Sequence, residues 1–525
     1  MRRTTRVEYL GHRQIAHDLS GPFAHVESTH ERIVTSIEAR HLDYVPARER
    51  HGKVWRQAPF WFLGNFQPFT VAIAFIGPVV GLSGLWTSVA GVAGILCGAM
   101  FMAAHAAQGP ILGLPQMIQS RAQFGYRGVI VPVVATTLTF VGFNVVTVVI
   151  IKQGLFSIFA WNTTGVALAV SVVAALVAIF GHDWIHRAVL SVFWVSLPLW
   201  IVLTVGVVSG HAGGHGPLVG GFSVVGFFAT FTVAASYNIT YAPCVSDYSR
   251  YLAKDTPRGG VTAAVFLGAV GSPVWLIPLG AWMATRLHVS DALAGIYVAG
   301  NGTVSHLGTT LALVAVAALV AAMGVSAYSG MLSVLTIVAA FRPVPSGVRV
   351  RVITIVSLLV LWFALGAVLT NATSVLNGWL IVMLYLLAPW TSINLVDFYF
   401  VRHGRFAISD LSSVSGVYGR WGVRGLTAYA IGIVVEVPFM SVMNLYQSPG
   451  ATWLKGVDVS WLVGLFAAAG TYFFLTRHLD RTKEEAAIER SEQIVGRDDV
   501  ASSEVNVDVE APSVQLKTSW RVARS

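Results

Sequence analysis

Long runs of apolar residues recur along the chain and are separated by short polar stretches. A helix needs about 20 apolar residues to cross the hydrocarbon core of a bilayer, and most of the runs reach that length. The pattern predicts an all-α, polytopic membrane protein with about twelve transmembrane helices. The predicted spans are 59–83, 86–107, 129–156, 164–181, 188–209, 222–243, 261–285, 306–340, 352–370, 377–399, 426–443 and 459–476.

Composition supports a membrane protein, and the placement of charge orients it. Only 11% of the 525 residues are charged, against about 25% in soluble proteins. The 34 Lys and Arg residues gather at both termini and in alternate loops, and the other loops hold only Lys152, Arg286 and Lys455. Because basic loops stay inside, we expect a multi-pass plasma-membrane protein with both termini in the cytoplasm. The net charge of +9 therefore reflects topology, not a nucleic-acid partner.

These patterns divide the chain into four parts. We expect a cytoplasmic N-terminal segment (1–57), a transport core of ten helices (58–400), a cytoplasmic loop with two further helices (401–476) and a cytoplasmic tail (477–525). The tail is rich in charge and Ser, which predicts partial disorder with a helix over 480–493. The run 306–340 exceeds one straight crossing, so we expect it to include a segment outside the membrane.

Two spans are interrupted by polar residues and proline. The first reads Phe62-Leu-Gly-Asn-Phe-Gln-Pro68, and the sixth reads Ser236-Tyr-Asn-Ile-Thr-Tyr-Ala-Pro243. Proline removes a backbone donor, and the carbonyl groups freed by it need protein or a wet cavity in front of them. The two spans are the first members of two five-helix halves, and such matched breaks are typical of secondary-transporter binding sites. Two ordinary proline kinks are the alternative.

Other classes of protein find little support in the sequence. A channel would need a continuous polar stripe or filter rings, and a membrane enzyme would need a cluster of catalytic residues or metal ligands. Cys97 and Cys244 lie on different spans, which argues against a disulfide or a metal site. We therefore expect a transporter that is not an enzyme and that uses no cofactor.

Several motifs agree in order and spacing with one transporter family. They lie at 46–53, 113–128, 242–252, 328–330 and 393–399. The segment 242–252, with the sequence Ala-Pro-Cys-Val-Ser-Asp-Tyr-Ser-Arg-Tyr-Leu, is similar to the signature of the purine–cytosine permease group. The chain thus resembles the nucleobase–cation symporter-1 family over roughly residues 38–405.

This resemblance implies a leucine-transporter-type fold, in which five helices repeat inverted and two more follow. The substrate would lie between broken helices one and six and helices three, eight and ten. The function implied is import of a nucleobase-like heterocycle, such as cytosine or a purine, by ion symport. A vitamin or allantoin/hydantoin-type permease of the same fold is the alternative.

The resemblance also locates a pocket. It places the usual aromatic residue of span three at Phe143 and the following polar residue at Thr147. A flat heterocycle needs a stacking face and paired donors and acceptors, and Phe143 and Tyr237 would sandwich it. The side chains expected at its edges are Asn65, Gln67, Thr147, Ser236, Asn238 and Ser326. Packing by Phe143, and a bond from Thr147 to its own helix, are the alternatives.

The coupling ion is predicted to be a proton. Sodium-coupled relatives hold Na⁺ with span-one carbonyls and two span-eight hydroxyls, and the resemblance places Val320 and Ala321 at the hydroxyl positions. Alkyl side chains offer no ligand to a hard cation. Glu436 is the carboxylate that lies well inside a predicted span, which makes it the proton-coupling candidate. Because span eleven lies outside the ten-helix core, a structural role for Glu436 is the alternative.

Overall fold

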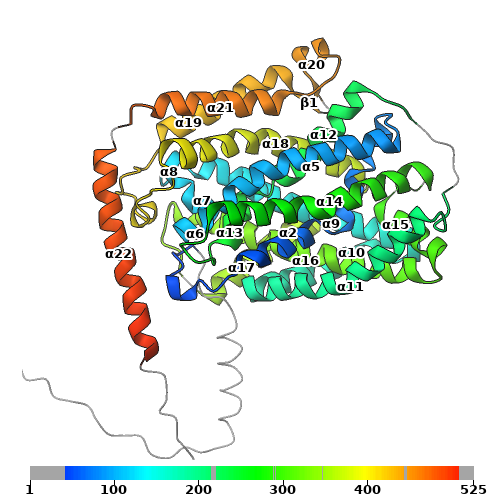
Figure 1. Cartoon of the computed structure of the whole chain (residues 1–525), viewed down its shortest axis with the longest axis horizontal. Helices are drawn as coiled ribbons and strands as arrows, with labels where there is room; N and C mark the ends of the chain where they lie inside the picture. Colours follow the sequence, from blue (N-terminus) through cyan, green and yellow to red (C-terminus); the bar gives the residue numbers. More distant parts are fainter. Residues whose placement is uncertain are drawn as a thin grey trace, which may run out of the picture.

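The computed structural model describes residues 42–214, 220–287, 289, 291–345, 347–442, 446–479 and 481–507. Its long helices run side by side along one direction (Figure 1). One end of the bundle, called the tail side below, holds α6 (Gln108–Leu112), α8 (Arg121–Phe124) and the C-terminal α22 (Thr482–Val507). The opposite side holds α15 (Ala292–Thr303) and α20 (Pro449–Trp453).

Each of the twelve predicted spans corresponds to a helix or to a broken helix. Among the described residues, eight helices are long and apolar enough to cross a membrane. They are α5 (Gly84–Ala106, continued by α6), α9 (Ile130–Phe159), α10 (Thr163–Phe180), α11 (His182–Val208), α14 (Arg258–Arg286), α16 (Leu307–Ala339), α17 (Val348–Val368) and α18 (Ala372–Val396). Three further spans are the shorter α12 (Val224–Ile239), α19 (Val423–Glu436) and α21 (Ser460–Thr476). The broken first span completes the set.

The first span breaks where the sequence predicts. Helix α2 (Gln57–Asn65) ends before Gln67, whose backbone is extended, and α3 (Pro68–Ile73) begins at the proline. Proline suits the first position of a helix because its missing N–H would be unpaired there in any case. With α4 (Ile76–Val79), the second half of the span is bent by 54° from the first.

The sixth span changes from α-helix to a tighter turn before its proline. Helix α12 is followed by the 3₁₀ turn η3 (Ala242–Cys244) and by the short helix α13 (Val245–Ser249). Pro243 lies inside η3. Both predicted breaks are therefore present in the backbone.

Helices from both halves of the chain surround the two breaks. Helices α12 and α14 pack along α5, and α14 also contacts α2 and α3. On the other side, α9 packs against α16, α17 and α18. The helix order is that of two five-helix units followed by two more helices, and the fold prediction is confirmed.

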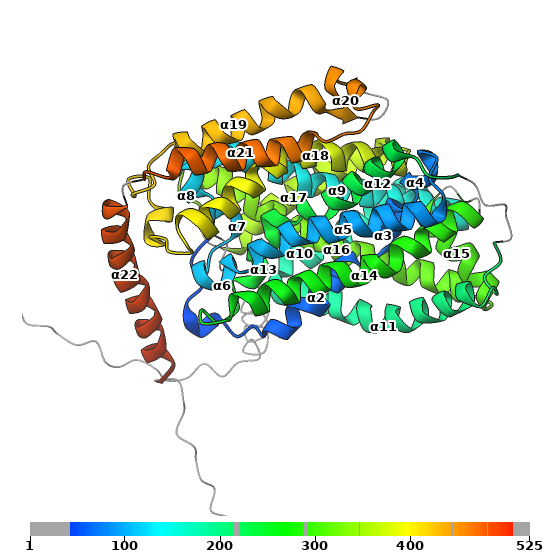
Figure 2. The same cartoon turned by 45° about the horizontal axis from the view of Figure 1, so that its top comes forward.

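The C-terminal helices lie on one flank of the bundle. Figures 1 and 2 both show α19 and α21 beside α18, and the two pack against each other and against α18. Between them, η6 (Val437–Phe439) leads to a small hairpin of β1 (Ser441–Val442) and β2 (Tyr446–Gln447). The remaining short elements are η1 (Ala47–Glu49), η2 (Val54–Arg56), α7 (Gln116–Gln119), η4 (Asp397–Val401) and η5 (Ser409–Ser412).

The structure differs from the sequence predictions in several element boundaries. The run 306–340 forms one unbroken helix, α16, and the additional helix α15 precedes it. Helix α19 ends at Glu436, well before the predicted end of span eleven at 443. Helix α22 continues beyond the predicted limit of 493. Residues 1–41 of the predicted N-terminal segment and 508–525 of the predicted tail lie outside the described residues.

Candidate binding site at the broken helices

The two breaks touch each other through a pair of asparagines. The Asn65 amide, at the end of α2, donates to Asn238 Oδ1 at 3.1 Å and to the backbone oxygen of Ala269 at 2.9 Å. Asn238, on α12, donates in turn to the backbone oxygen of Ile95. Both asparagines are buried. The Asn65 Oδ1 atom has no hydrogen-bond partner among the described residues, so one acceptor at the break is left for a ligand.

Gln67 and Thr70 connect the first break to Tyr237. The Gln67 amide donates to the backbone oxygen of Gly64 at 2.5 Å and lies 3.4 Å from the Tyr237 hydroxyl. The Thr70 hydroxyl donates to the backbone oxygen of Asn65 at 2.5 Å and also lies 3.4 Å from that phenol oxygen. These bonds cap carbonyl groups that the helix break would otherwise leave unpaired. Gln67 Oε1 remains without a hydrogen-bond partner in the part of the chain that the structure describes.

Aromatic rings line the same region, but not as the predicted sandwich. Phe143 and Tyr237 lie edge to face, with centroids 6.2 Å apart and planes at 73°. Phe143 instead stacks on Tyr241 at 4.8 Å, and Tyr237 stacks on Phe69 at 5.2 Å. In this conformation the four rings pack against one another. The predicted site did not include Phe69, which directly follows Pro68, or Tyr241, which lies one helical turn after Tyr237.

The other predicted residues are buried but make local bonds. The Thr147 hydroxyl donates to the backbone oxygen of Phe143 at 2.7 Å, which is the alternative considered for it. The Ser236 hydroxyl donates across to the backbone oxygen of Leu380 on α18 at 2.5 Å. Ser326 lies buried on α16. Asn65, Gln67, Phe143, Tyr237 and Asn238 therefore form the cluster, with Ser236 at its border toward α18.

Asn144 is a polar residue that sequence reasoning missed. It follows Phe143 on α9 and is 1% exposed. Neither its amide nitrogen nor its amide oxygen has a hydrogen-bond partner among the residues that the structure describes. Gly330 of α16 packs against Phe140 of α9, because a Cβ added to Gly330 would lie 3.3 Å from Phe140 Cβ. Helices α9 and α16 run in opposite directions. Asn144, one turn after Phe140, is therefore level with Ser326, one turn before Gly330. The signal available in the sequence was an isolated Asn inside a long apolar span.

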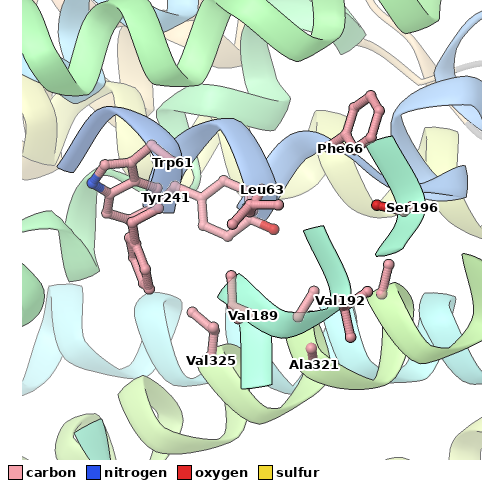
Figure 3. A pocket seen from close by; sticks show the side chains of 13 residues that line it. Trp61, Leu63, Phe66, Val189, Val192, Ser196, Tyr241, Ala321 and Val325 are labelled. Carbon is pink, nitrogen blue, oxygen red and sulfur yellow. The ribbon is translucent and has the colours of Figure 1, made fainter. Parts of the chain in front are cut away.

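An apolar pocket adjoins the first break on the side of α11 and α16. Figure 3 shows Trp61, Leu63 and Phe66 of the first span facing Val189 and Val192 of α11. The wall from α16 consists of Ala318, Ala321, Ala322 and Val325. Val320, the other residue at a predicted sodium-ligand position, is also buried. This wall carries no side-chain oxygen.

Glu436 lies away from the broken helices. It is the last residue of α19 and packs closely against Gly464 of α21. A Cβ added to Gly464 would lie only 1.9 Å from Glu436 Oε1. The side chain is fully buried, and neither carboxylate oxygen has a hydrogen-bond partner within the described part of the chain. Its position outside the ten-helix core favours the structural alternative over direct contact with the substrate.

The motifs that carry the family resemblance meet on the tail side. The backbone nitrogen of Gln116 donates to Asp247 Oδ1 at 2.9 Å, which joins the segment 113–128 to the segment 242–252. The Gln116 amide donates to Gln108, and Gln108 donates to Asn394 of α18 at 2.6 Å. A β-bridge between Gly52 and Leu252 adds the lead-in segment 46–53. These motifs therefore form a hydrogen-bonded layer on the tail side of the broken helices, called the closure below.

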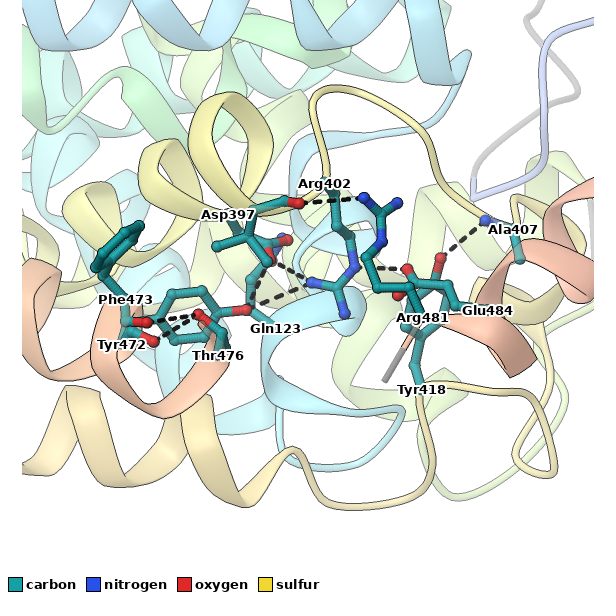
Figure 4. Close-up of polar contacts among 11 residues, drawn as sticks. Gln123, Asp397, Arg402, Ala407, Tyr418, Tyr472, Phe473, Thr476, Arg481 and Glu484 are labelled. Atoms are coloured by element: carbon teal, nitrogen blue, oxygen red, sulfur yellow. Dashed lines mark hydrogen bonds and ion pairs between the residues drawn. The ribbon is translucent and has the colours of Figure 1, made fainter. Parts of the chain in front are cut away.

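A buried ion-pair cluster extends this closure to the tail helix. Figure 4 shows Arg402 between Asp397, at the end of the tenth span, and Glu484 of α22. Gln123 and Tyr472 also donate to the Asp397 carboxylate. Burial acts to lower the pKa of Arg402, but Asp397 and its neighbours outweigh burial and raise that pKa above its ordinary value. The cluster ties α8, the end of α18, α21 and α22 together.

Comparison with known proteins decides the family. Residues 44–464 match the family model described as permease for cytosine/purines, uracil, thiamine, allantoin. The chain belongs to this permease family. The permease is 31% identical over 445 residues to "Putative purine-cytosine permease YxlA" of Bacillus subtilis (strain 168), covering 84% of this chain and 96% of that protein. It is 23% identical over 478 residues to "Purine-cytosine permease fcyB" of Emericella nidulans, covering 86% of this chain and 92% of that protein.

Solved structures show that the permease shares its fold with known symporters. It superimposes with a TM-score of 0.67 on Mhp1, a nucleobase-cation-symport-1 family transporter in a closed conformation with bromovinylhydantoin bound. That match covers 87% of this chain and 99% of Mhp1 at 19% identity. A Na⁺-coupled sialic acid symporter gives a TM-score of 0.58 at 10% identity over 87% of this chain and 96% of that chain. The predicted family is confirmed, and the permease is a multi-pass membrane transporter, not an enzyme.

Proposed function

We propose that the permease imports a nucleobase-like heterocycle, such as cytosine or a purine, through the pocket at the two broken helices. The observation that carries the proposal is the set of buried amide atoms at Asn65, Gln67 and Asn144 that have no partner among the described residues. Gln67 lies 3.4 Å from the Tyr237 hydroxyl, and Asn144 follows Phe143 in α9. Unpaired amide groups in a membrane interior are costly unless a ligand satisfies them. A flat ring with amide-like edges meets both needs.

Binding requires the aromatic cluster to open. In the present conformation Phe69 stacks on Tyr237 and Phe143 stacks on Tyr241. A planar substrate that separates these pairs replaces each ring–ring contact with a ring–substrate contact, so little stacking energy is lost. Thr147, Ser236, Asn238 and Ser326 complete the proposed pocket as neighbours from α9, α12 and α16.

A vitamin or allantoin/hydantoin-type permease is the second candidate. The family description includes thiamine and allantoin, and Mhp1 was solved with a hydantoin bound. The same amide and ring groups would serve a hydantoin, which is also flat and carries N–H and C=O edges. Substrate choice within this set depends on the arrangement of the edge groups.

We also propose that transport is driven by protons and that the tail side faces the cytoplasm. The alkyl wall of α16 next to the first break supports the first point, because Na⁺ needs several oxygen ligands. The basic loops on the tail side support the second. Glu436 remains the candidate for a titrating group, though its place at the end of α19 makes a structural role the stronger alternative.

The test is an uptake panel in cells that express the permease. It contains cytosine, adenine, guanine, hypoxanthine, uracil, allantoin, a hydantoin, thiamine and pyridoxine. We expect uptake of a nucleobase, and Phe143→Ala should raise its KM because a stacking surface worth about 1–3 kcal/mol is lost. Uptake of only the vitamins or the hydantoin class selects the second candidate. No uptake of any compound by correctly inserted protein would overturn the proposal.

A further inference from the structure

A cavity with basic walls opens on the tail side, beside the closure. It encloses about 830 Å³, including the solvent at its mouth. Its walls come from the segment 51–60 at the start of the first span, from α11, and from the segment 248–252. Gly52 and Leu252, whose β-bridge belongs to the closure, are part of the lining. The cavity therefore lies between the first span, the fifth span and the segment that follows the sixth.

Three cationic side chains line the cavity. Lys53, Arg56 and Arg187 are exposed, and Lys and Arg side chains carry a positive charge at neutral pH. Among the residues whose side chains the structure describes, no carboxylate pairs with these three or lines the cavity. Such a concentration of one charge attracts an anion, and guanidinium groups match the oxygens of a phosphate.

Two exposed tryptophans place these arginines at the surface of the membrane. The Arg56 guanidinium lies 5.6 Å from the ring centre of Trp55, and the Arg187 guanidinium lies 5.5 Å from the ring centre of Trp184. The two tryptophans are 64% and 43% exposed. Tryptophan gathers at the level of the lipid headgroups, where its ring meets hydrocarbon and its N–H meets water. Both arginines therefore lie at the depth of phospholipid phosphates.

The cavity adjoins the helices that form the apolar pocket at the first break. Phe60 of α2 lines both spaces, and its ring stacks on that of His186 of α11 at 5.1 Å. Arg56 comes one turn before Phe60, and Arg187 directly follows His186. An anion held by both arginines would therefore bridge the first span and α11 next to their aromatic contact.

We propose that this cavity binds the headgroup of an anionic phospholipid from the cytoplasmic leaflet. The inference rests on the proposed orientation, in which the tail side faces the cytoplasm. Arg56 and Arg187 hold the lipid phosphate, and Trp55 and Trp184 contact the upper part of the acyl chains. A zwitterionic lipid binds more weakly, because the basic side chains repel the cation in its headgroup. The bound lipid holds the tail-side ends of the first span and α11 together and so stabilises the folded permease.

Native mass spectrometry of the purified full-length protein tests the site. The probes are phosphatidylglycerol and phosphatidylcholine, added at equal concentration to delipidated protein in detergent. Wild type should retain phosphatidylglycerol preferentially, and the double variant Arg56→Gln with Arg187→Gln should lose this preference. No preference in wild type, or the same preference in the double variant, would overturn the proposal. If the double variant does not fold, Arg187→Gln alone replaces it, because Arg187 is exposed.

The matched control removes two arginines of the same kind from outside the cavity. Arg342 and Arg349 are exposed, lie in and after the loop between α16 and α17, and are not part of the lining. The variant Arg342→Gln with Arg349→Gln should keep the preference of wild type. Loss of the preference in this control would show a general effect of charge and would contradict a site at the cavity.

A second measurement distinguishes a lipid from a soluble anion. Inorganic phosphate and glycerol 3-phosphate carry the phosphate chemistry without acyl chains. Phosphatidylglycerol should raise the unfolding temperature of wild type but not that of the cavity variant, and the soluble anions should shift neither. An equal shift with the soluble anions would assign the cavity to a free phosphate compound and overturn the lipid site. Neither measurement needs a transported substrate, so failure of the proposed function, seen as absence of uptake, is distinguishable from failure of this inference.

Discussion

Asn144 has a side chain that forms no hydrogen bond with any residue the structure describes. Both amide atoms are buried and unpaired on α9, whereas Thr139 on the same helix bonds the backbone oxygen of Ala135. An unpaired amide in this setting destabilises the fold by about 1–3 kcal/mol. A residue that costs stability in this way is typical of a binding group.

Asn144→Leu should therefore separate stability from binding. We expect its unfolding temperature to stay equal to or rise above that of wild type, while substrate affinity falls by about 1–3 kcal/mol because the ring edge loses its partner. Radioligand binding and thermal unfolding of the purified protein measure the two effects. Thr139→Val is the control and should keep wild-type affinity. Wild-type affinity in Asn144→Leu would remove Asn144 from the pocket.

At this scale the sequence predicted the polar residues of the breaks better than the aromatic geometry. Asn65, Gln67 and Asn238 lie where proline and amides interrupt the spans, and the structure brings them together. The pairing of Phe143 with Tyr241 depends on how α9 and α12 rotate about their axes. Rotation of a helix that is apolar on all sides leaves no periodic signal, because no face of it is marked by polar residues.

The side chains of helix α16 beside the first break bear on the identity of the driving ion. Its wall beside the first break is built of Ala318, Ala321, Ala322 and Val325. Uptake should rise with an inward proton gradient, collapse with a protonophore and be unaffected when choline replaces Na⁺. Proteoliposomes at fixed pH and voltage provide the measurement, and a requirement for Na⁺ there would contradict proton coupling.

A gain-of-function variant sharpens this test. The pair Val320→Thr with Ala321→Ser supplies two hydroxyl groups at the predicted sodium-ligand positions of α16, where the wild type carries alkyl side chains. Sodium stimulation that appears in this variant and is absent from wild type would support the assignment of the two positions. The single variant Ala322→Ser serves as a control for added polarity on the same wall.

Helix α22 is held by a charge pair that its own sequence does not reveal. Glu484 contacts Arg402, which lies 82 residues earlier in the chain, and both side chains are buried. Removing one partner of a buried pair is typically destabilising by 3–5 kcal/mol. Glu484→Gln should therefore lower the unfolding temperature and expose the tail to limited proteolysis. Glu485→Gln, at an exposed position of the same turn, should do neither.

Element boundaries were harder to predict than element number. The apolar runs gave the number of spans because each run must match the thickness of the bilayer. Helix α15 was missed because its 12 residues are too few for a crossing and it connects two long spans. Helix α19 ends at Glu436, two residues before Pro438. Proline terminates a helix whether or not the apolar run continues.

The whole chain has a topology that can be tested directly. A reporter fused after residue 525 and a reporter inserted at Gly213, in the loop between α11 and α12, should lie on opposite sides of the membrane. The first should be cytoplasmic, because the basic loops lie on the tail side. Accessibility to a membrane-impermeant label in intact cells measures both. Two reporters on the same side would contradict an odd number of crossings between them.

The closure on the tail side has a consequence for how relatives of this transporter are compared. Its contacts, such as Gln116 with Asp247 and Gln108 with Asn394, join the segments by which the family is recognised. The groups proposed to touch cargo, such as Asn144, lie elsewhere. Homologues that share those segments should therefore share these tail-side contacts, while their substrate-binding residues can differ. Cargo should diverge among such homologues more quickly than their recognisable signature does.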